Sequence, residues 1–232
     1  MPSPFKTPWH FDKFKVDNDY VKIVGVINGN WANEVELARS KGVTKSNYNE
    51  QRYEHAANKK SENHTKEDTE NPDGKPEATM FRRIRFNARP DDFPKFMKIA
   101  DLLKFDTTQN HTFKFNDQFP NDQLMWHIDN LPGNPRKERV IDNPDFKYQH
   151  PDKTRFLITL EDHQPGQIFQ FGSIVYTQWK AGTIFAWEWS TLPHITWNGS
   201  WHKRPCLQLT GTATEDTWTL VKNGNAETIY NV

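Results

Sequence analysis

Cysteine is nearly absent from this chain, and its one residue of this type, Cys206, cannot form an intramolecular disulfide. Long apolar runs are also missing, since no stretch reaches the length of a transmembrane helix or of the core of a secretion signal. The phosphate-binding loop, the glycine-rich dinucleotide motif and the Cys-x-x-Cys pair do not occur. We therefore expect a soluble, cytoplasmic protein without a membrane partner.

An excess of charge of either sign is missing too. The 232 residues hold 30 Lys and Arg against 30 Asp and Glu, so no global field favours nucleic acid, which is not expected as a partner. Only 34% of the residues are hydrophobic, yet aromatic residues reach 13%, with nine Trp and sixteen Phe. Large rings can fill a core that has few aliphatic side chains. The length fits a single domain over residues 1–232.

The stretch 192–211 combines a turn with two unusual polar residues. Short extended runs flank Asn198-Gly199-Ser200, which predicts a hairpin of two strands. His194 begins the first run and Arg204 begins the second, and each costs desolvation energy in apolar surroundings unless it is bound. A metal would satisfy the imidazole, and a carboxylate would satisfy the guanidinium.

A matching pair of ligands lies upstream, in the segment 124–129. His127 and Asp129 are two residues apart, so on an extended strand their side chains point to the same face. With His194 they supply two imidazoles and one carboxylate, the set that binds non-haem Fe(II) and leaves the opposite positions open. The sequence therefore predicts a metal site at His127, Asp129 and His194.

His-x-Asp by itself is a weak signal, and His127 alone would be interpreted as a hydrogen-bonded core histidine. The pattern occurs three times, at His10/Asp12, His127/Asp129 and His150/Asp152. The first precedes any expected core strand, and the last contains a proline and lies too close to the next strand. Only the middle pair has a suitable setting.

These residues resemble the Fe(II)- and 2-oxoglutarate-dependent dioxygenase superfamily, in particular its prolyl-hydroxylase-like members. The family's His-x-Asp, distal His and later Arg match His127, Asp129, His194 and Arg204. The text between them also fits, with RFLITLED at 155–162, GQIFQFG at 166–172 and WKAGTIFAWE at 179–188. The resemblance covers roughly residues 110–212, and the order and spacing are more specific than any single motif.

The resemblance implies a mainly β fold, a double-stranded β-helix (jelly roll or cupin-like) with a few flanking helices. It further implies Fe(II) on the two histidines and the aspartate, and the co-substrate 2-oxoglutarate with its far carboxylate on Arg204. With O2, such an enzyme hydroxylates a C–H bond and releases succinate and CO2. For prolyl-hydroxylase-like members the acceptor is an amino-acid side chain, peptidyl prolyl or similar. Many members carry Ser two residues after the Arg, where this chain has Cys206, so the second co-substrate contact stays open.

The organisation of the chain follows from its patterns. Short strands at close spacing from Arg155 onward favour a sandwich or barrel, so residues 110–212 are the expected jelly-roll core. Flanking strands and helices are expected in 1–109. They are interrupted by a polar loop at 41–78, for which a lid and a disordered insertion are equally good interpretations. Asn223-Gly224 between extended runs predicts a terminal hairpin in 213–232.

Two alternatives remain at this stage. The chain could be a non-catalytic jelly-roll protein that binds a metal or ligand, or a cupin-type metalloenzyme that does not use 2-oxoglutarate. In the second case Arg204 would be a structural ion-pair residue. The sequence does not identify the peptide, protein or small-molecule substrate, or the oligomeric state.

Overall fold

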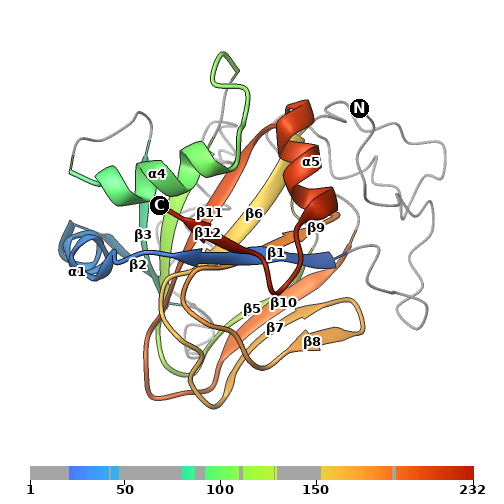
Figure 1. The fold of residues 1–232 in the computed structure, drawn as a ribbon. Helices are drawn as coiled ribbons and strands as arrows, with labels where there is room; N and C mark the ends of the chain where they lie inside the picture. The colour runs from blue at the N-terminus through green and yellow to red at the C-terminus, as the bar shows by residue number, and fades with distance from the viewer. Residues whose placement is uncertain are drawn as a thin grey trace, which may run out of the picture.

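Two β-sheets organise the computed structural model of this protein (Figure 1). The structure describes residues 21–41, 43–46, 80–86, 92–109, 112–127, 129, 153–189 and 192–232. Within these residues, no helix has both the length and the hydropathy that crossing a bilayer requires.

The larger sheet has eight strands and joins the N-terminal part of the chain to the core. In sheet order they are β12 (Ile229–Asn231), β1 (Val21–Asn28), β9 (Thr183–Trp187), β6 (Lys153–Thr159), β11 (Arg204–Thr212), β4 (Thr112–Gln118), β3 (Met80–Phe86) and β2 (Val43–Ser46). All neighbours are antiparallel except β12 and β1, which are parallel. The flanking segments thus extend the central sheet.

The smaller sheet has four antiparallel strands and faces the larger one. In sheet order they are β5 (Asp122–His127), β10 (His194–Asn198), β7 (Gln167–Phe171) and β8 (Ile174–Tyr176). Side chains of both sheets share one buried cluster, which includes Leu157 and Phe185 from the larger sheet and Phe169 and Phe171 from the smaller. The arrangement is a jelly roll, so the expected fold class is confirmed.

The predicted hairpin within 192–211 is wrong in its pairing, although both strands exist. β10 pairs with β5 and β7 in the smaller sheet, whereas β11 pairs with β4 and β6 in the larger. The connection therefore crosses from one sheet to the other. The buried Asn198 amide stabilises this crossing, because it donates to the carbonyls of Gln118, Phe119 and His202.

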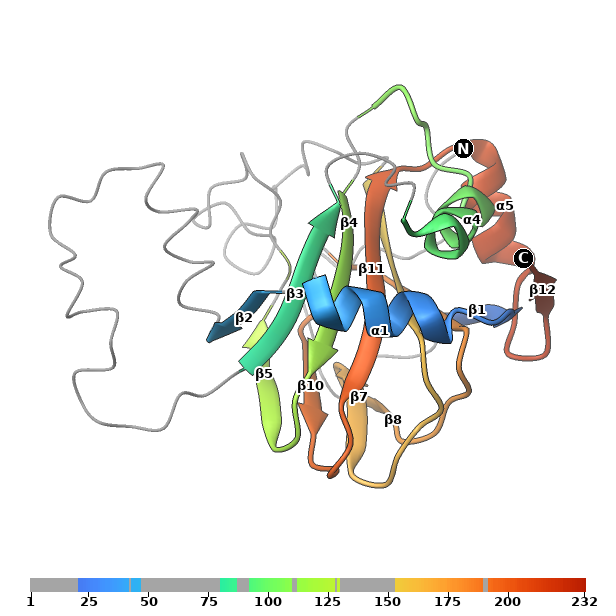
Figure 2. The same cartoon turned by 90° about the vertical axis from the view of Figure 1, so that its left-hand side faces the viewer.

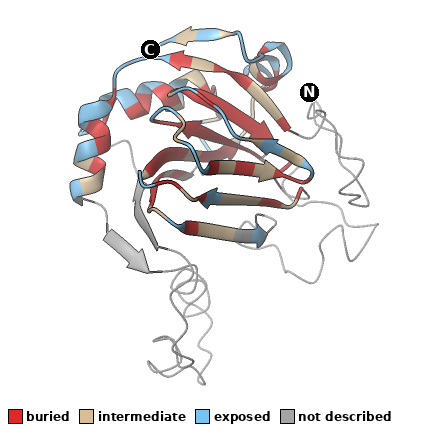
Figure 3. Cartoon of the chain, turned by 90° about the horizontal axis from the view of Figure 1, so that it is seen from below, coloured by how far each residue is buried: buried red, intermediate tan, exposed pale blue. Residues whose placement is uncertain are grey.

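Three helices cover the face of the larger sheet that points away from the smaller one (Figures 1 and 2). They are α1 (Ala32–Lys41), α4 (Pro94–Leu102) and α5 (Glu215–Asn223). Each alternates between buried and exposed residues, as Figure 3 shows. The Glu34 carboxylate of α1 accepts the backbone N–H groups of Lys95 and Phe96 at 2.7 and 2.8 Å. It thereby satisfies free N–H groups in the first turn of α4 and ties the two helices together.

The hairpin predicted for 213–232 is also wrong, because its first half is helix α5. Thr214 and Thr217 form a capping box at the start of this helix, and Trp218 and Val221 bury one of its faces. The Asn-Gly pair is the end of the helix, with Gly224 at the C-cap. The second half is the short strand β12, which pairs with β1. The helical spacing of the buried residues and the capping box therefore outweighed the turn signal of the Asn-Gly pair in this segment.

Part of the polar loop expected at 41–78 belongs to regular structure, since α1 ends at Lys41 and Val43–Ser46 forms β2. The question of a lid concerns residues 47–78, which lie outside the described part of the chain. The flanking strands and helices expected in 1–109 include β1, α1, β3 and α4.

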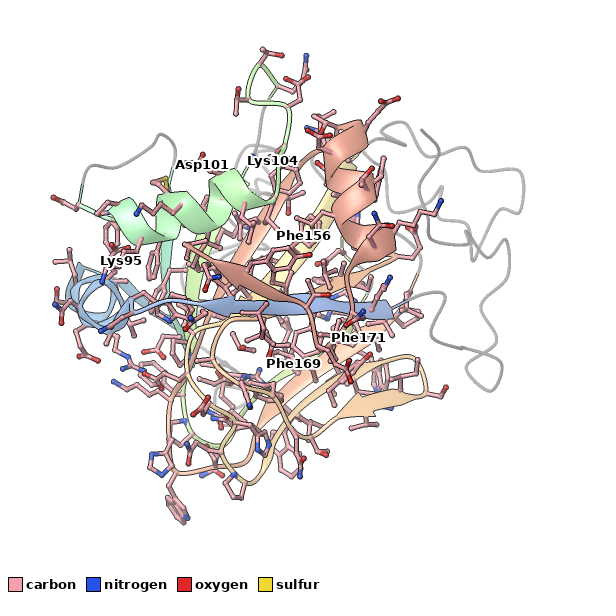
Figure 4. All side chains as sticks on the ribbon, in the orientation of Figure 1. Lys95, Asp101, Lys104, Phe156, Phe169 and Phe171 are labelled. Carbon is pink, nitrogen blue, oxygen red and sulfur yellow. The ribbon has the colours of Figure 1, made fainter. Side chains whose placement is uncertain are left out.

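The central strands β4, β6 and β11 have two chemically different faces. The helix face carries apolar side chains that belong to the cluster with the three helices: Phe113, Phe115, Phe156, Ile158, Leu207 and Leu209. The inner face, toward the smaller sheet, carries the alternate residues: Asn116, Gln118, Arg155, Leu157, Arg204 and Cys206. Figure 4 shows Phe156 on the helix side and Phe169 and Phe171 in the space between the sheets.

Candidate metal centre

Neighbouring strands of the smaller sheet bring the two predicted histidine ligands together. His127 is the last residue of β5, His194 is the first residue of β10, and the two are register partners. Their ring centres are 4.2 Å apart. The sequence predicted that Asp129 would share the strand of His127, but it lies two residues beyond the end of β5. Its side chain nevertheless reaches the two imidazoles.

The three side chains form a group that could hold a metal ion. One potential ligand atom from each of His127, Asp129 and His194 lies within 4.8 Å of the others. The Nε2 atom of His127 is 3.7 Å from Oδ1 of Asp129, and Nε2 of His194 is 3.4 Å from Oδ2. Two imidazole nitrogens therefore face the two oxygens of one carboxylate.

The hydrogen bonding of His194 indicates a cation at this position. Its Nδ1 lies 3.1 Å from the carbonyl of Leu192, and because a carbonyl can only accept, Nδ1 carries the proton. In the neutral imidazole, Nε2 then presents a lone pair to the Asp129 carboxylate, which is also an acceptor. A proton or a metal ion between them removes this conflict. A backbone carbonyl that fixes the tautomer in this way is the usual companion of a metal-binding histidine.

Arg155 is a site residue that the sequence analysis missed. It lies on the inner face of β6, is 5% exposed, and its Nη1 is 2.5 Å from Oδ2 of Asp129. Its Nε donates to the hydroxyl of Thr210 at 2.7 Å, and its guanidinium lies over the ring of Trp189. The available signal was an arginine directly before the apolar run 156–158, since a buried arginine requires a partner.

The charges around Asp129 favour its ionised form. Burial by itself would raise the pKa of this carboxyl, but the positive charge of Arg155, followed by the imidazoles of His194 and His127, holds that pKa well below its usual range. The carboxylate is therefore available as an anionic ligand at neutral pH.

Arg204, the predicted co-substrate residue, lies deep between the sheets and is 4% exposed. Its Nη1 donates to the carbonyls of Ile168 and Trp197 at 2.7 and 3.3 Å, and its Nη2 donates to the side chain of Gln118. The guanidinium carbon lies 4.1 Å from the ring centre of Phe169. The remaining donor, Nε, is buried without a hydrogen-bond partner.

The surroundings of Arg204 favour an anion beside it. Burial lowers the pKa of Arg204 to about 10, and the electrostatic interactions with Cys206 and Asp122 only partly oppose this effect. A buried donor without an acceptor is costly, so both its charge and its free Nε would be stabilised by a carboxylate. Trp197, whose carbonyl Arg204 contacts, is three residues along β10 from His194, which is about 10 Å of extended strand.

Polar and aromatic side chains divide the space between the sheets. Aromatic rings surround His194 on one side, with the ring centres of Trp187 and Phe171 at 5.4 and 5.9 Å. On the other side the lining is polar, and the hydroxyl of Thr196 donates to the Gln118 side chain at 3.4 Å. Cys206 is buried on the same inner face, two residues after Arg204. A strip of polar groups thus connects the candidate metal ligands with Arg204.

Comparisons with known proteins give structural similarities at low identity. No protein family model matches the sequence, and no curated protein matches it. A prolyl-4-hydroxylase from Pseudomonas putida is 11% identical with a TM-score of 0.41, and the match covers 77% of this chain and 87% of that one. A Cupin 2 conserved barrel domain protein from Salinispora arenicola is 8% identical with a TM-score of 0.33, covering 61% and 83%. A predicted oxalate decarboxylase from Thermotoga maritima is 9% identical with a TM-score of 0.33, covering 57% and 81%. Similarity at this level does not indicate a shared activity.

Proposed function

We propose that the protein is an Fe(II)- and 2-oxoglutarate-dependent oxygenase. The observation that carries this proposal is the conflict between two acceptors, Nε2 of His194 and the Asp129 carboxylate, which a divalent metal would remove. Two imidazoles and one carboxylate are the donor set that suits non-haem Fe(II) and leaves one side of the ion open. When bound, Fe(II) and 2-oxoglutarate would supply the activation of O2 for hydroxylation.

The residues of this chain would hold the co-substrate at its two ends. The free Nε of Arg204 would bind the far carboxylate of 2-oxoglutarate, while the keto-acid end would lie at the metal-binding side chains. The distance of about 10 Å along β10 between Trp197 and His194 suits the length of 2-oxoglutarate. The aromatic rings beside His194 would limit the access of water to the reacting centre.

The substrate class follows from the resemblance of residues 110–212 to prolyl-hydroxylase-like proteins. We propose that the acceptor is an amino-acid side chain in a peptide or protein, with proline as the first candidate and a small molecule as the alternative. The presence of a carboxylate at position 129 favours hydroxylation, because related halogenating enzymes lack this ligand.

The experiment that tests the proposal is an anaerobic titration of the metal-free protein with Fe(II) and 2-oxoglutarate, followed by visible absorption. The charge-transfer band of a chelated keto acid is expected in the wild type. It should be absent in His194→Ala and weakened in Arg204→Ala. Arg39→Ala is the matched control, because it removes another arginine from a partly buried ion pair, on the helix side of the sheet. If the band appears, succinate production is screened next, beginning with proline-containing peptides.

A metalloenzyme that does not use 2-oxoglutarate is the second candidate, and one observation favours it. Arg204 already donates to the carbonyls of Ile168 and Trp197 and to Gln118, so it could have a purely structural role between the sheets. The same titration separates the two candidates. Iron binding without a charge-transfer band would refute the use of 2-oxoglutarate and leave this candidate, or a non-catalytic metal-binding protein.

A further inference from the structure

Arg155 is held at three points in a position that fits one task at the metal centre. Its Nε donates to Thr210 on the neighbouring strand β11, and the face of its guanidinium lies 5.1 Å from the ring centre of Trp189. Trp189 is fixed in turn, because its indole N–H donates to the carbonyl of Lys153. The third point is the Asp129 carboxylate. The Arg155 side chain therefore has little freedom to move with the Asp129 carboxylate.

The guanidinium contacts one of the two oxygens of Asp129. Oδ2 lies 2.5 Å from Nη1 of Arg155 and 3.4 Å from Nε2 of His194, whereas Oδ1 lies 3.7 Å from Nε2 of His127. A carboxylate oxygen that shares its charge with a guanidinium is the weaker metal ligand, so binding through the other oxygen alone is favoured. If both oxygens bound the metal, the carboxylate would take one of the positions that a facial set of ligands leaves open.

We propose that Arg155 is a positioning residue that restricts Asp129 to monodentate metal binding and so keeps an additional coordination position open. This inference rests on the proposed metal site. It explains why the buried Arg155 lies beside Asp129, although the metal also needs the negative charge of that carboxylate. The number of open positions decides whether a chelating co-substrate and O2 can bind together. Arg155 would therefore control the coordination number without contacting the metal.

The test counts the water molecules on bound Mn(II), a spectroscopic stand-in for Fe(II), by water-proton relaxation of the full-length protein. The affinity for Mn(II) does not decide the question, because the removal of Arg155 changes it in two ways at once. It abolishes the repulsion between the guanidinium and the metal, and it also abolishes the contact that positions Asp129. All samples are therefore compared at Mn(II) loading verified by electron paramagnetic resonance. With one atom from each of the three ligands, the wild type should hold about three exchangeable waters.

In Arg155→Met the relaxation enhancement per bound Mn(II) should fall by about one third, because the freed carboxylate takes one of the open positions. Arg155→Lys should restore most of it, since an ammonium group can still hold Oδ2. Arg39→Met is the matched control. It breaks the partly buried ion pair of Arg39 with Asp117 on the helix side of the sheet, and it should leave the value per bound Mn(II) unchanged.

Equal enhancement in Arg155→Met and the wild type would overturn the inference while the metal site stands. About two waters on the wild-type protein would overturn it as well, without any variant that must fold. If the wild type bound no Mn(II), the proposed function and the inference would both fail. A merely structural role for Arg155 predicts a lower melting temperature in Arg155→Met and an unchanged number of waters.

Discussion

The two faces of strands β4, β6 and β11 show how one set of strands serves two purposes. On the helix face Phe115, Ile158 and Leu207 are completely buried among apolar neighbours. On the inner face the alternate positions hold polar and charged residues such as Arg155 and Arg204, which are buried nearly as deeply. Burial of charge is costly, whereas burial of apolar area is favourable. The helix face therefore supplies stability, and the inner face uses part of it to hold chemical groups in place.

The largest effect is expected from a cavity on the helix face. Phe156→Ala removes a fully buried ring between the sheet and the helices, and it should lower the free energy of unfolding by about 3–5 kcal/mol. Urea unfolding measures this loss. The folded variant should still bind Mn(II) with wild-type affinity, and a loss of metal binding below its unfolding transition would contradict the separation of the two faces.

A loss of folding stability of comparable size, but with a different pH dependence, is expected for a substitution on the inner face. In the metal-free protein at pH 7, Asp129→Asn leaves the buried Arg155 without its partner and should cost about 3 kcal/mol. The pKa of Asp129 is depressed in the folded state, so this stabilisation is complete above the unfolded-state pKa of about 3.9 and is lost as the pH falls through the folded-state pKa.

Urea unfolding of the wild type and Asp129→Asn between pH 7 and pH 3 measures this dependence. The difference in stability should shrink below about pH 4. The deficit of Phe156→Ala should stay constant over the same range, because no charge is involved. A constant difference for Asp129→Asn as well would show that the pKa of Asp129 is the same in the folded and unfolded protein.

A smaller effect, which concerns only the binding of 2-oxoglutarate, is expected for a substitution of Arg204. Arg204→Met should weaken the binding of 2-oxoglutarate to the Mn(II)-loaded protein at least tenfold, or about 1.4 kcal/mol, because the carboxylate loses a charged donor. The affinity for Mn(II) should change less than about threefold, since Arg204 does not belong to the metal-binding side chains. Isothermal titration calorimetry measures both constants, with Arg39→Met as the control. Unchanged co-substrate affinity would assign Arg204 a structural role.

The smallest effect is expected at Cys206, where many members of the resembled superfamily carry Ser. Cys206→Ser places a hydroxyl on the inner face two residues from Arg204, and it should tighten 2-oxoglutarate binding by about one hydrogen bond, or 0.5–1.5 kcal/mol. The same calorimetric titration measures it. Weaker binding would mean that position 206 contacts the co-substrate through its apolar surface, and unchanged binding would mean that it does not contact the co-substrate.

Much of the candidate site could be predicted because its signals are local. The spacing of His127 and Asp129, the later His194 and Arg204, and the alternation of the strands are all readable along the chain. The structure brings the first three within 4.8 Å of one another and places Arg204 on the same inner space. Errors arose where a local signal had two meanings. Asn198-Gly199-Ser200 and Asn223-Gly224 both suggested hairpins, but one is part of a crossing between sheets and the other ends a helix.

The sequence by itself determined which residue types alternate along each strand, and therefore which face of the central strands is apolar and which is polar. Only the tertiary structure decided which strands are neighbours, because pairing depends on contacts between residues far apart in the chain. Arg155 meets Asp129 from another strand, and the Leu192 carbonyl fixes the tautomer of His194. Both contacts depend on distances that residue spacing does not encode, so the candidate ligands could be predicted from the sequence and the groups that orient them could not.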